Sequence, residues 1–190
     1  TFLNAHCQQA VCGPSRASAM TGKYPDFTQV WDLKTKIRAI HPEIVTLTQH
    51  FKNNGYHTAG VGKIFDPRSV DKGSDSRSWS EAYTQTWHLK YNEKTGKPIA
   101  HYHNSKSKTL AAEDKSANWN AINKKLFANN AWPAVEALDV PDDAYDDGAI
   151  AAHAVKSLAK LAKKKKPFFL AVGFKKPHLP FVAPKRYWDR

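Results

Sequence analysis

The chain has 190 residues, of which 41% are hydrophobic and 12% aromatic, and its formal net charge is +12. Such a chain can bury a hydrophobic core, which excludes an intrinsically disordered protein. No apolar run approaches the roughly 20 residues of a membrane-spanning helix, so no membrane span is predicted. The positive charge favours anionic partners, namely nucleic acid, a membrane surface or an acidic polysaccharide.

Neither end of the chain has the features of a natural terminus. The sequence lacks an initiator Met, and its first residues show no basic segment followed by an apolar stretch. We therefore expect that both ends are truncated and that residues 1–190 contain no signal peptide. The only cysteines, Cys7 and Cys12, are too few to indicate a redox compartment.

The N-terminal part predicts a strand followed by a helix. Residues 1–11 are apolar enough for a strand, although Gln8 and Gln9 weaken that prediction. Residues 14–20 follow as a helix, with Pro14 at an early helical position and Gly22 after the end. This arrangement presents a side chain at a helix N-terminus.

A helix–strand unit and a long irregular segment come next. A helix is predicted from Pro42 to Asn54, because its apolar residues share one face, and a strand is predicted at residues 56–61. Residues 66–139 have weak periodicity, so we expect a long irregular insertion over the surface. Its tryptophans suit either a sugar site or a local small core; they are Trp79, Trp87, Trp119 and Trp132.

The last part repeats the helix-then-strand order. Asp146 and Asp147 are expected to cap a helix that precedes Pro167, and the four lysines at 163–166 are interpreted as its solvated end. Residues 168–173 are continuously apolar, which is typical of a buried parallel strand. The predicted fold class is therefore α/β. In such sheets sites lie at the carboxyl ends of strands, and Cys12, Lys63 and His178 each follow a predicted strand.

Cys12 has the strongest chemical signal. A cysteine at a helix N-terminus, near an arginine, has its anionic form favoured. Arg16 also suits a tetrahedral oxyanion, which it can bind through two N–H groups. These features predict a thiolate nucleophile or an anion-binding loop, and the alternative is a buried structural cysteine.

Residues 12–16 read Cys-Gly-Pro-Ser-Arg and residues 21–23 read Thr-Gly-Lys, which resembles the signature of the sulfatase family. Further segments resemble its iduronate-2-sulfatase branch; they are residues 8–12, 61–65, 138–141, 167–173 and 176–181. The resemblance implies an alkaline-phosphatase-like α/β fold with a largely parallel sheet flanked by helices. It also implies that residues 1–190 are an incomplete fragment of the N-terminal catalytic domain.

The resemblance further implies how the site works. A maturation enzyme converts Cys12 to formylglycine, whose hydrated form binds one calcium ion and attacks the sulfur of a sulfate ester. Arg16 orients this nucleophile, Lys63, Lys176 and His178 bind sulfate, and His178 also protonates the leaving oxygen. Apart from position 12, the calcium ligands are expected outside this chain, so the fragment alone is expected to be inactive.

One position departs from the family pattern. The iduronate-type branch has a histidine three residues after the lysine, whereas this chain has Asp66. The carboxylate can act as a base towards the nucleophile, or it is a turn residue before Pro67. The departure leaves the base and the substrate open.

The implied substrate is a sulfated sugar, for instance in a glycosaminoglycan, and the implied location is the periplasm or the exterior of the cell. No nucleic acid is expected as a partner. Two other hypotheses remain: a related hydrolase of phosphate esters or phosphonates, and a non-catalytic basic module that binds polyanions. His101 and His103 are a weak candidate metal-binding pair.

Overall fold

The computed structural model describes residues 2–89, 101–113 and 119–189. The chain divides into two compact units, which are treated separately below. The first unit comprises residues 1–86 and 154–174, and the second comprises residues 87–153 and 175–190. Among the described residues, no helix combines the length and apolar composition that crossing a bilayer requires.

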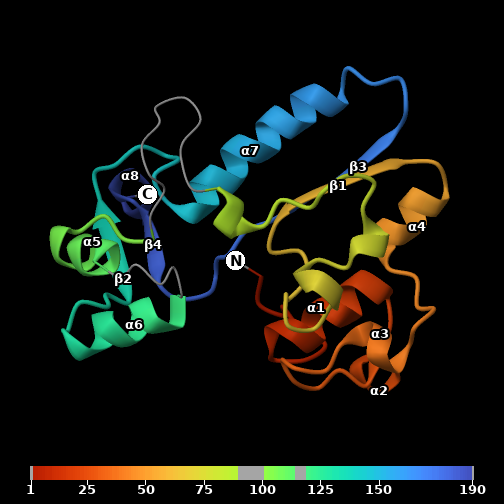
Figure 1. The fold of residues 1–190 in the computed structure, drawn as a ribbon, viewed down its shortest axis with the longest axis horizontal. Helices are drawn as coiled ribbons and strands as arrows, with labels where there is room; N and C mark the ends of the chain where they lie inside the picture. Colours follow the sequence, from red (N-terminus) through yellow and green to blue (C-terminus); the bar gives the residue numbers. More distant parts are fainter. Residues whose placement is uncertain (1, 90–100, 114–118, 190) are drawn as a thin grey trace. The chain divides into compact units, whose positions relative to one another are not determined.

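Helix α1 opens the first unit (Figure 1). It spans Cys12–Thr21 and ends at Gly22, whose left-handed backbone (φ 66°) lets its N–H donate to Ser18 O. The strand predicted before this helix is wrong, because residues 2–11 form turns and bends. Phe2 and Leu3 are 93% and 89% exposed, so these two side chains do not pack against the described part of the chain.

Three more helices follow in the first unit: α2 Pro25–Thr28, α3 Ile37–Ile40 and α4 Leu47–Asn53. Helix α4 begins five residues later than predicted, because Thr46 caps it by accepting a hydrogen bond from Gln49 N. The carbonyl groups of Pro42 and Ile44 instead accept hydrogen bonds from Arg38, so they are not available to a helix.

The sheet of the first unit pairs two strands that are distant in sequence. Strand β1 (His57–Gly62) runs parallel to β3 (Phe168–Gly173), with Val61 opposite Val172. The strands predicted at residues 56–61 and 168–173 are confirmed to within one residue, and they pair in parallel. The pairing continues past the strand ends, since Lys63 N donates to Gly173 O at 2.6 Å. Lys63 therefore lies at the carboxyl end of this sheet.

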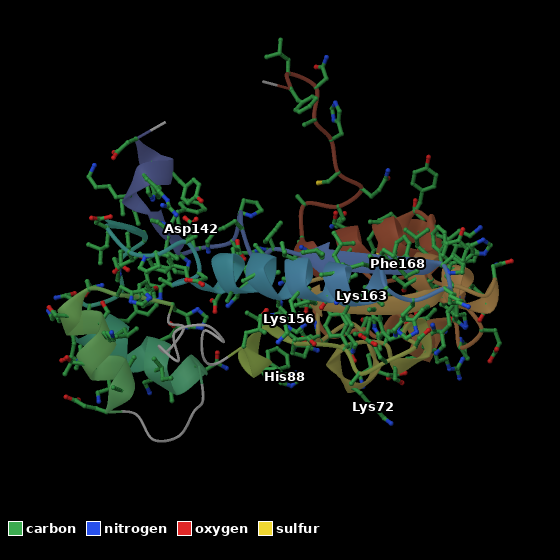
Figure 2. All side chains as sticks on the ribbon, turned by 90° about the horizontal axis from the view of Figure 1, so that it is seen from above. Lys72, His88, Asp142, Lys156, Lys163 and Phe168 are labelled. Atoms are coloured by element: carbon green, nitrogen blue, oxygen red, sulfur yellow. The ribbon has the colours of Figure 1, made fainter. Side chains whose placement is uncertain are left out.

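Helix α7 spans Asp146–Leu161 and contributes residues to both units. The lysine run begins two residues after its end, and residues 163–166 are exposed, as expected for a solvated segment. Figure 2 labels Lys156 and Lys163 from this part of the chain. Lys164 turns back to β1, where its Nζ lies 3.3 Å from His57 Nε2.

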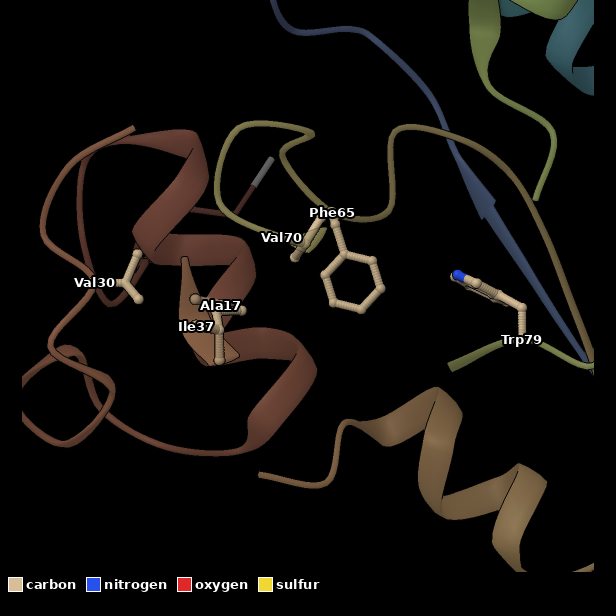
Figure 3. Close-up of a cluster of buried hydrophobic side chains, with 6 residues drawn as sticks. All are labelled: Ala17, Val30, Ile37, Phe65, Val70 and Trp79. Carbon is tan, nitrogen blue, oxygen red and sulfur yellow. The ribbon is translucent and has the colours of Figure 1, made fainter. Parts of the chain in front are cut away.

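The core of the first unit joins α1 to the segment after β1. Figure 3 shows its six buried side chains: Ala17, Val30, Ile37, Phe65, Val70 and Trp79. Trp79 is 5% exposed and its indole Nε1 donates to Ser74 O at 2.6 Å. Of the two readings for the tryptophans, the small-core reading is therefore correct for Trp79.

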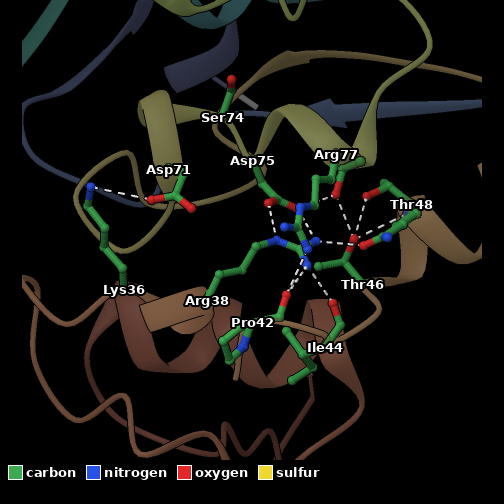
Figure 4. A network of polar contacts seen from close by, with 12 residues as sticks. Lys36, Arg38, Pro42, Ile44, Thr46, Thr48, Asp71, Ser74, Asp75 and Arg77 are labelled. Carbon is green, nitrogen blue, oxygen red and sulfur yellow. Dashed lines mark hydrogen bonds and ion pairs between the residues drawn. The ribbon is translucent and has the colours of Figure 1, made fainter. Parts of the chain in front are cut away.

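The first unit also contains a buried ion pair between Arg38 and Asp75 (Figure 4). Arg38 Nε and Nη2 donate to the two carboxylate oxygens of Asp75 at 2.6 and 2.9 Å. The same guanidinium donates to Ile44 O and to Gln49 Oε1. Buried charges are tolerated only when they are paired and fully hydrogen-bonded, and this pair meets both conditions.

The second unit contains a parallel pair of strands, helices α5, α6 and α8, and the first half of α7. Strand β2 (Val135–Leu138) pairs with β4 (Phe181–Pro184), and α8 (Lys185–Trp188) follows. Helix α5 spans Ser105–Ala112 and α6 spans Trp119–Ala128, so the prediction of an irregular segment is wrong there. Asn104 caps α5 by accepting from Ser107 N, and Leu126 of α6 is fully buried. Three short 3-10 helices follow β1 along the chain: Asp71–Gly73 and Ser76–Ser78 in the first unit, and Thr86–His88 at the boundary of the two units.

Candidate active site

Cys12 is the first residue of α1, so its side chain stands at the N-terminal end of a ten-residue helix. Val11 before it is extended, and Ser15 N donates to Val11 O at 3.0 Å to close the first turn. Gly13 is required by close packing, since an added Cβ would lie 2.8 Å from Ser69 Oγ and 3.2 Å from Asp32 O. Residue 69 and its neighbours therefore pack directly against the start of α1.

Arg16 lies one turn further along α1 and binds the backbone that follows β1. Its Nη1 donates to the carbonyl oxygens of Lys63 and Ile64, the latter at 3.0 Å. Cys12 and Lys63 come from distant parts of the sequence, and Arg16 ties their two segments together. The structure thus places Arg16 where it fixes the position of Lys63.

Tyr83, a residue that the sequence analysis did not single out, supports the same turn. Its hydroxyl donates to Gly62 O at 2.6 Å and accepts from Ile64 N at 3.2 Å. Burial raises the pKa of Tyr83 to about 12, so the hydroxyl keeps its proton at neutral pH. Arg16 and Tyr83 together hold residues 62–64 from two sides.

Lys63 and Asp66 both contact the sulfur of Cys12. The Cys12 thiol donates to Asp66 Oδ2 at 3.1 Å, and Lys63 Nζ lies 3.9 Å from Cys12 Sγ. Lys63 Nζ is also 3.3 Å from Asp66 Oδ2. Four predicted site residues of the first unit therefore come together: Cys12, Arg16, Lys63 and Asp66.

Arg68 is the second site residue that sequence reasoning missed. Its Nε and Nη2 donate to the two oxygens of Asp66 at 2.8 and 2.9 Å, and Nη2 lies 3.9 Å from Cys12 Sγ. The sequence feature that could have indicated Arg68 is its position two residues after Asp66, with Pro67 between them. An aspartate oxygen can accept from the backbone N–H two residues on, and Arg68 N donates to Asp66 Oδ1 in this way.

Both readings of Asp66 have a structural counterpart. Asp66 forms the turn that leads to Arg68, and its fully buried side chain also contacts Cys12. Burial acts to raise the pKa of this carboxyl, but hydrogen bonds from Arg68 and Cys12 and the charge of Lys63 outweigh it. The pKa of Asp66 is consequently held well below its usual range, so the group is a carboxylate at neutral pH.

Lys176 and His178 lie in the second unit, on the segment between β3 and β4. His178 Nδ1 donates to Lys175 O at 2.6 Å, so Nε2 is the ring nitrogen that can take part in a proton transfer. Burial lowers the pKa of Lys176, and its Nζ donates to His178 O at 3.2 Å. The two residues thus share one short segment, as predicted.

Asp146 and Asp147 anchor this segment to the start of α7. Asp147 accepts hydrogen bonds from Lys175 N and Lys176 N at 2.6 and 3.0 Å. Asp146 pairs with His101 Nδ1 and with Lys175 Nζ. Burial acts to raise the pKa of Asp146, but its bond to His101 and these charges hold the pKa well below the usual range. The pair therefore does more than begin a helix.

The described residues do not fit a calcium site. Within residues 2–89, 101–113 and 119–189, no three His, Cys, Asp or Glu side chains gather as metal ligands. Both oxygens of Asp66 already accept hydrogen bonds from other residues. His101 pairs with Asp146, and His103 Nε2 contacts Ala144 O at 2.9 Å, so the candidate histidine pair does not share a ligand position.

Comparison with known proteins gives the class of this chain. The sulfatase family model matches residues 1–190, and the chain belongs to the sulfatase family. It is 37% identical to mouse (Mus musculus) iduronate 2-sulfatase over 98% of this chain and 30% of that protein. A sulfatase of Formosa agariphila is 30% identical over 100% of this chain and 34% of its own length. The chain thus spans about a third of the curated relatives it matches.

A solved structure supports the fold. The crystal structure of Ps i-CgsB in complex with k-i-k-neocarrahexaose superposes with a TM-score of 0.51 at 20% identity. The match covers 90% of this chain and 36% of that one. The predicted α/β class, of the alkaline-phosphatase-like type, is confirmed, and so is the resemblance to sulfatases.

Proposed function

We propose that the full-length protein hydrolyses sulfate esters and that Cys12 is the precursor of its nucleophile. The observation that carries the proposal is the set of charged groups around Cys12 Sγ. One carboxylate oxygen lies 3.1 Å away, and two cationic groups lie 3.9 Å away, in a chain of the sulfatase family. Cations close to a nucleophile stabilise the charge on a transferring sulfuryl group.

The residues around position 12 fit formylglycine. Asp66 offers an acceptor, and Lys63 and Arg68 offer donors, which suits an oxygen-bearing group with its own O–H. When present, this group supplies a hydrated aldehyde, one of whose hydroxyl groups would act as the nucleophile. A maturation enzyme is therefore a proposed partner of the protein.

The residues of this chain have distinct proposed roles. Lys63 binds sulfate oxygens, and Arg16 keeps Lys63 in place by binding its carbonyl group. Asp66 accepts a hydrogen bond from the group at position 12 and is the proposed base. From the family resemblance, Lys176 and His178 are proposed to bind sulfate, and His178 to donate a proton to the leaving oxygen. Because the described residues do not fit a calcium site, no step is assigned to a metal ion.

We propose a sulfated sugar, alone or within an acidic polysaccharide, as the substrate. The net charge of +12 supports this proposal, because a positive field raises the local concentration of a sulfated polymer. Periplasmic or secreted location is proposed on the same basis, since such polymers occur outside the cytoplasm.

The test uses the full-length protein produced together with a formylglycine-generating enzyme. The Cys12 peptide is expected to be about 18 Da lighter than unmodified cysteine. The protein should also hydrolyse the sulfate ester of a phenol faster than the phosphate ester. An unmodified thiol at position 12, or preferential phosphate hydrolysis, would contradict the proposal.

Cys7 supplies a matched control. Its thiol is exposed and donates to Gln9 O. We expect Cys12→Ala to lower kcat about a thousandfold or more, because the nucleophile is lost. Cys7→Ala should leave kcat unchanged.

A further inference from the structure

The net positive charge around position 12 depends on Arg68. Lys63 is paired with the buried carboxylate of Asp66, so these two residues together are neutral. A sulfate ester is an anion, and its transferring group needs a net positive surrounding. Among the described residues in contact with Cys12 Sγ, Arg68 carries the remaining positive charge.

We infer that Arg68 is a substrate-binding residue of this site, whose guanidinium contacts the sulfuryl oxygens, and that Asp66 holds it there. The inference rests on the proposed sulfatase function and adds a residue to it. Arg68 Nη2 and Lys63 Nζ lie equally far, 3.9 Å, from Cys12 Sγ. Hydrogen bonds between N–H and oxygen are about 2.9 Å long, so a group bound against position 12 is within reach of both cations.

The position of Arg68 is fixed on several sides. Its side chain forms a two-point pair with Asp66, and its backbone N–H donates to the same carboxylate at 3.1 Å. The next residue, Ser69, donates its N–H to Asp66 O, and its Oγ lies close to Gly13 at the start of α1. A guanidinium held in this way loses little freedom when an anion binds.

The exposure of the pair agrees with a role in binding. The Asp66 side chain is fully buried, whereas the Arg68 side chain is 56% exposed. Asp66 binds Nε and Nη2 of the guanidinium, and Nη2 also faces Cys12 Sγ at 3.9 Å. The buried Asp66 carboxylate thus fixes one edge of the Arg68 guanidinium, and the exposed edge has N–H groups that can donate to an oxyanion.

The test compares variants of the full-length protein. Arg68→Ala removes the cation, and Arg68→Lys keeps the charge without the two-point pair. Arg77→Ala is the matched control, because Arg77 is also about half exposed, at 53%, but binds Pro42 O and Glu43. Formylglycine content and melting temperature are measured for each variant, so that defects in maturation or folding are corrected for.

Two measurements are made with different probes. Binding of inorganic sulfate, followed by titration calorimetry, should weaken about tenfold or more in Arg68→Ala, with partial recovery in Arg68→Lys. The kcat/KM for a phenyl sulfate ester should fall about a hundredfold, the usual effect of removing one oxyanion donor. Arg77→Ala should match the wild type in both.

The outcomes separate the two proposals. A wild type that binds sulfate through Arg68 but hydrolyses no sulfate ester would disprove the sulfatase function and support only the binding of a sulfate anion by Arg68. An active enzyme whose Arg68→Ala variant binds sulfate like the wild type would show that Arg68 only neutralises Asp66. A wild type that does not bind sulfate would also overturn the inference.

Discussion

The residues that hold Lys63 show how little freedom the candidate site has. Its N–H is bound by Gly173 O, its carbonyl by Arg16, and its ammonium group by Asp66. Tyr83 binds the two neighbouring residues. A side chain fixed at so many points is preorganised, and small displacements of such groups are costly for catalysis.

Gly173 gives a direct test of this constraint. A Cβ at residue 173 would overlap the backbone of Lys63 and would touch Ile64 N at 2.7 Å. Since backbone atoms cannot rotate away, Gly173→Ala should displace Lys63. We expect a loss of about 1–3 kcal/mol in stability, and kcat/KM should fall about tenfold to a hundredfold.

The control is Gly22→Ala, at the end of α1. Gly22 has φ of 66° and no atom within 4 Å of an added Cβ, so only backbone strain of about 1 kcal/mol is expected. Thermal melting and steady-state kinetics of the full-length protein check both variants. Equal effects of the two substitutions on kcat/KM would contradict the proposed role of the Gly173–Lys63 contact.

At the scale of elements, the parts predicted from sequence were those with a strong local signal. Helix α7 has an apolar face and two acidic residues at its start, and β3 is an unbroken apolar run. Helices α5 and α6 were missed because their charged and polar residues conceal the few buried positions, such as Leu126. Residues 2–11 were wrongly predicted as a strand because composition alone does not provide a pairing partner.

The residues of the candidate site likewise fall into those that the sequence predicted and those that it did not. Cys12 and Arg16 were predicted from a local motif, and Lys63 from its place after a strand. Arg68 and Tyr83 could not be predicted, because their contacts depend on how the chain folds back after β1. Such contacts arise from tertiary structure, which a spacing pattern does not encode.

The first turn of α7 provides a prediction for the second unit. Asp147 accepts the backbone N–H groups of Lys175 and Lys176, so it positions the segment that carries His178. Asp147→Ala leaves both groups without this acceptor. We expect KM for a sulfate ester to rise about tenfold, with a smaller change in kcat, because ground-state binding is lost.

Two further variants sharpen this test. Asp147→Asn keeps one acceptor oxygen and should recover part of the loss. Asp189→Ala removes an exposed carboxylate that pairs with Lys185 and should leave KM unchanged. Kinetics with the full-length protein distinguish these cases, and a KM for Asp147→Ala equal to that of the wild type would contradict the positioning role.

At the scale of the whole molecule, buried ionisable groups set the pH range of stability. The pKa values of Asp66, Glu136 and Asp146 are all held below their usual range. The folded state therefore binds fewer protons than the unfolded state. The stability that these groups contribute is present above about pH 4 and is lost as the pH falls further.

Buried tyrosines, among them Tyr83 and Tyr102, set the upper pH limit of stability. Burial raises the pKa of Tyr83 and Tyr102 to about 12. Their contribution is present below about pH 10 and is lost as the pH rises through the folded-state pKa. We expect the melting temperature to be highest between these limits, and Asp146→Asn should make its acid decline less steep. A melting temperature that rises between pH 5 and pH 3 would contradict this prediction.

The parallel pairing of β1 with β3 has a consequence for the order of folding. His57 is opposite Phe168, more than a hundred residues away, and Lys63 is bound by Gly173 at the end of the same pair. Contacts of such high sequence separation form late, because the entropy of closing the intervening loop is lost before they stabilise the chain. Helices α1 and α4 can form while the chain is still being synthesised, but Lys63 acquires its backbone partner only after residue 173 has been added. The geometry around Lys63 in the candidate site is thus completed only after β3 has paired with β1.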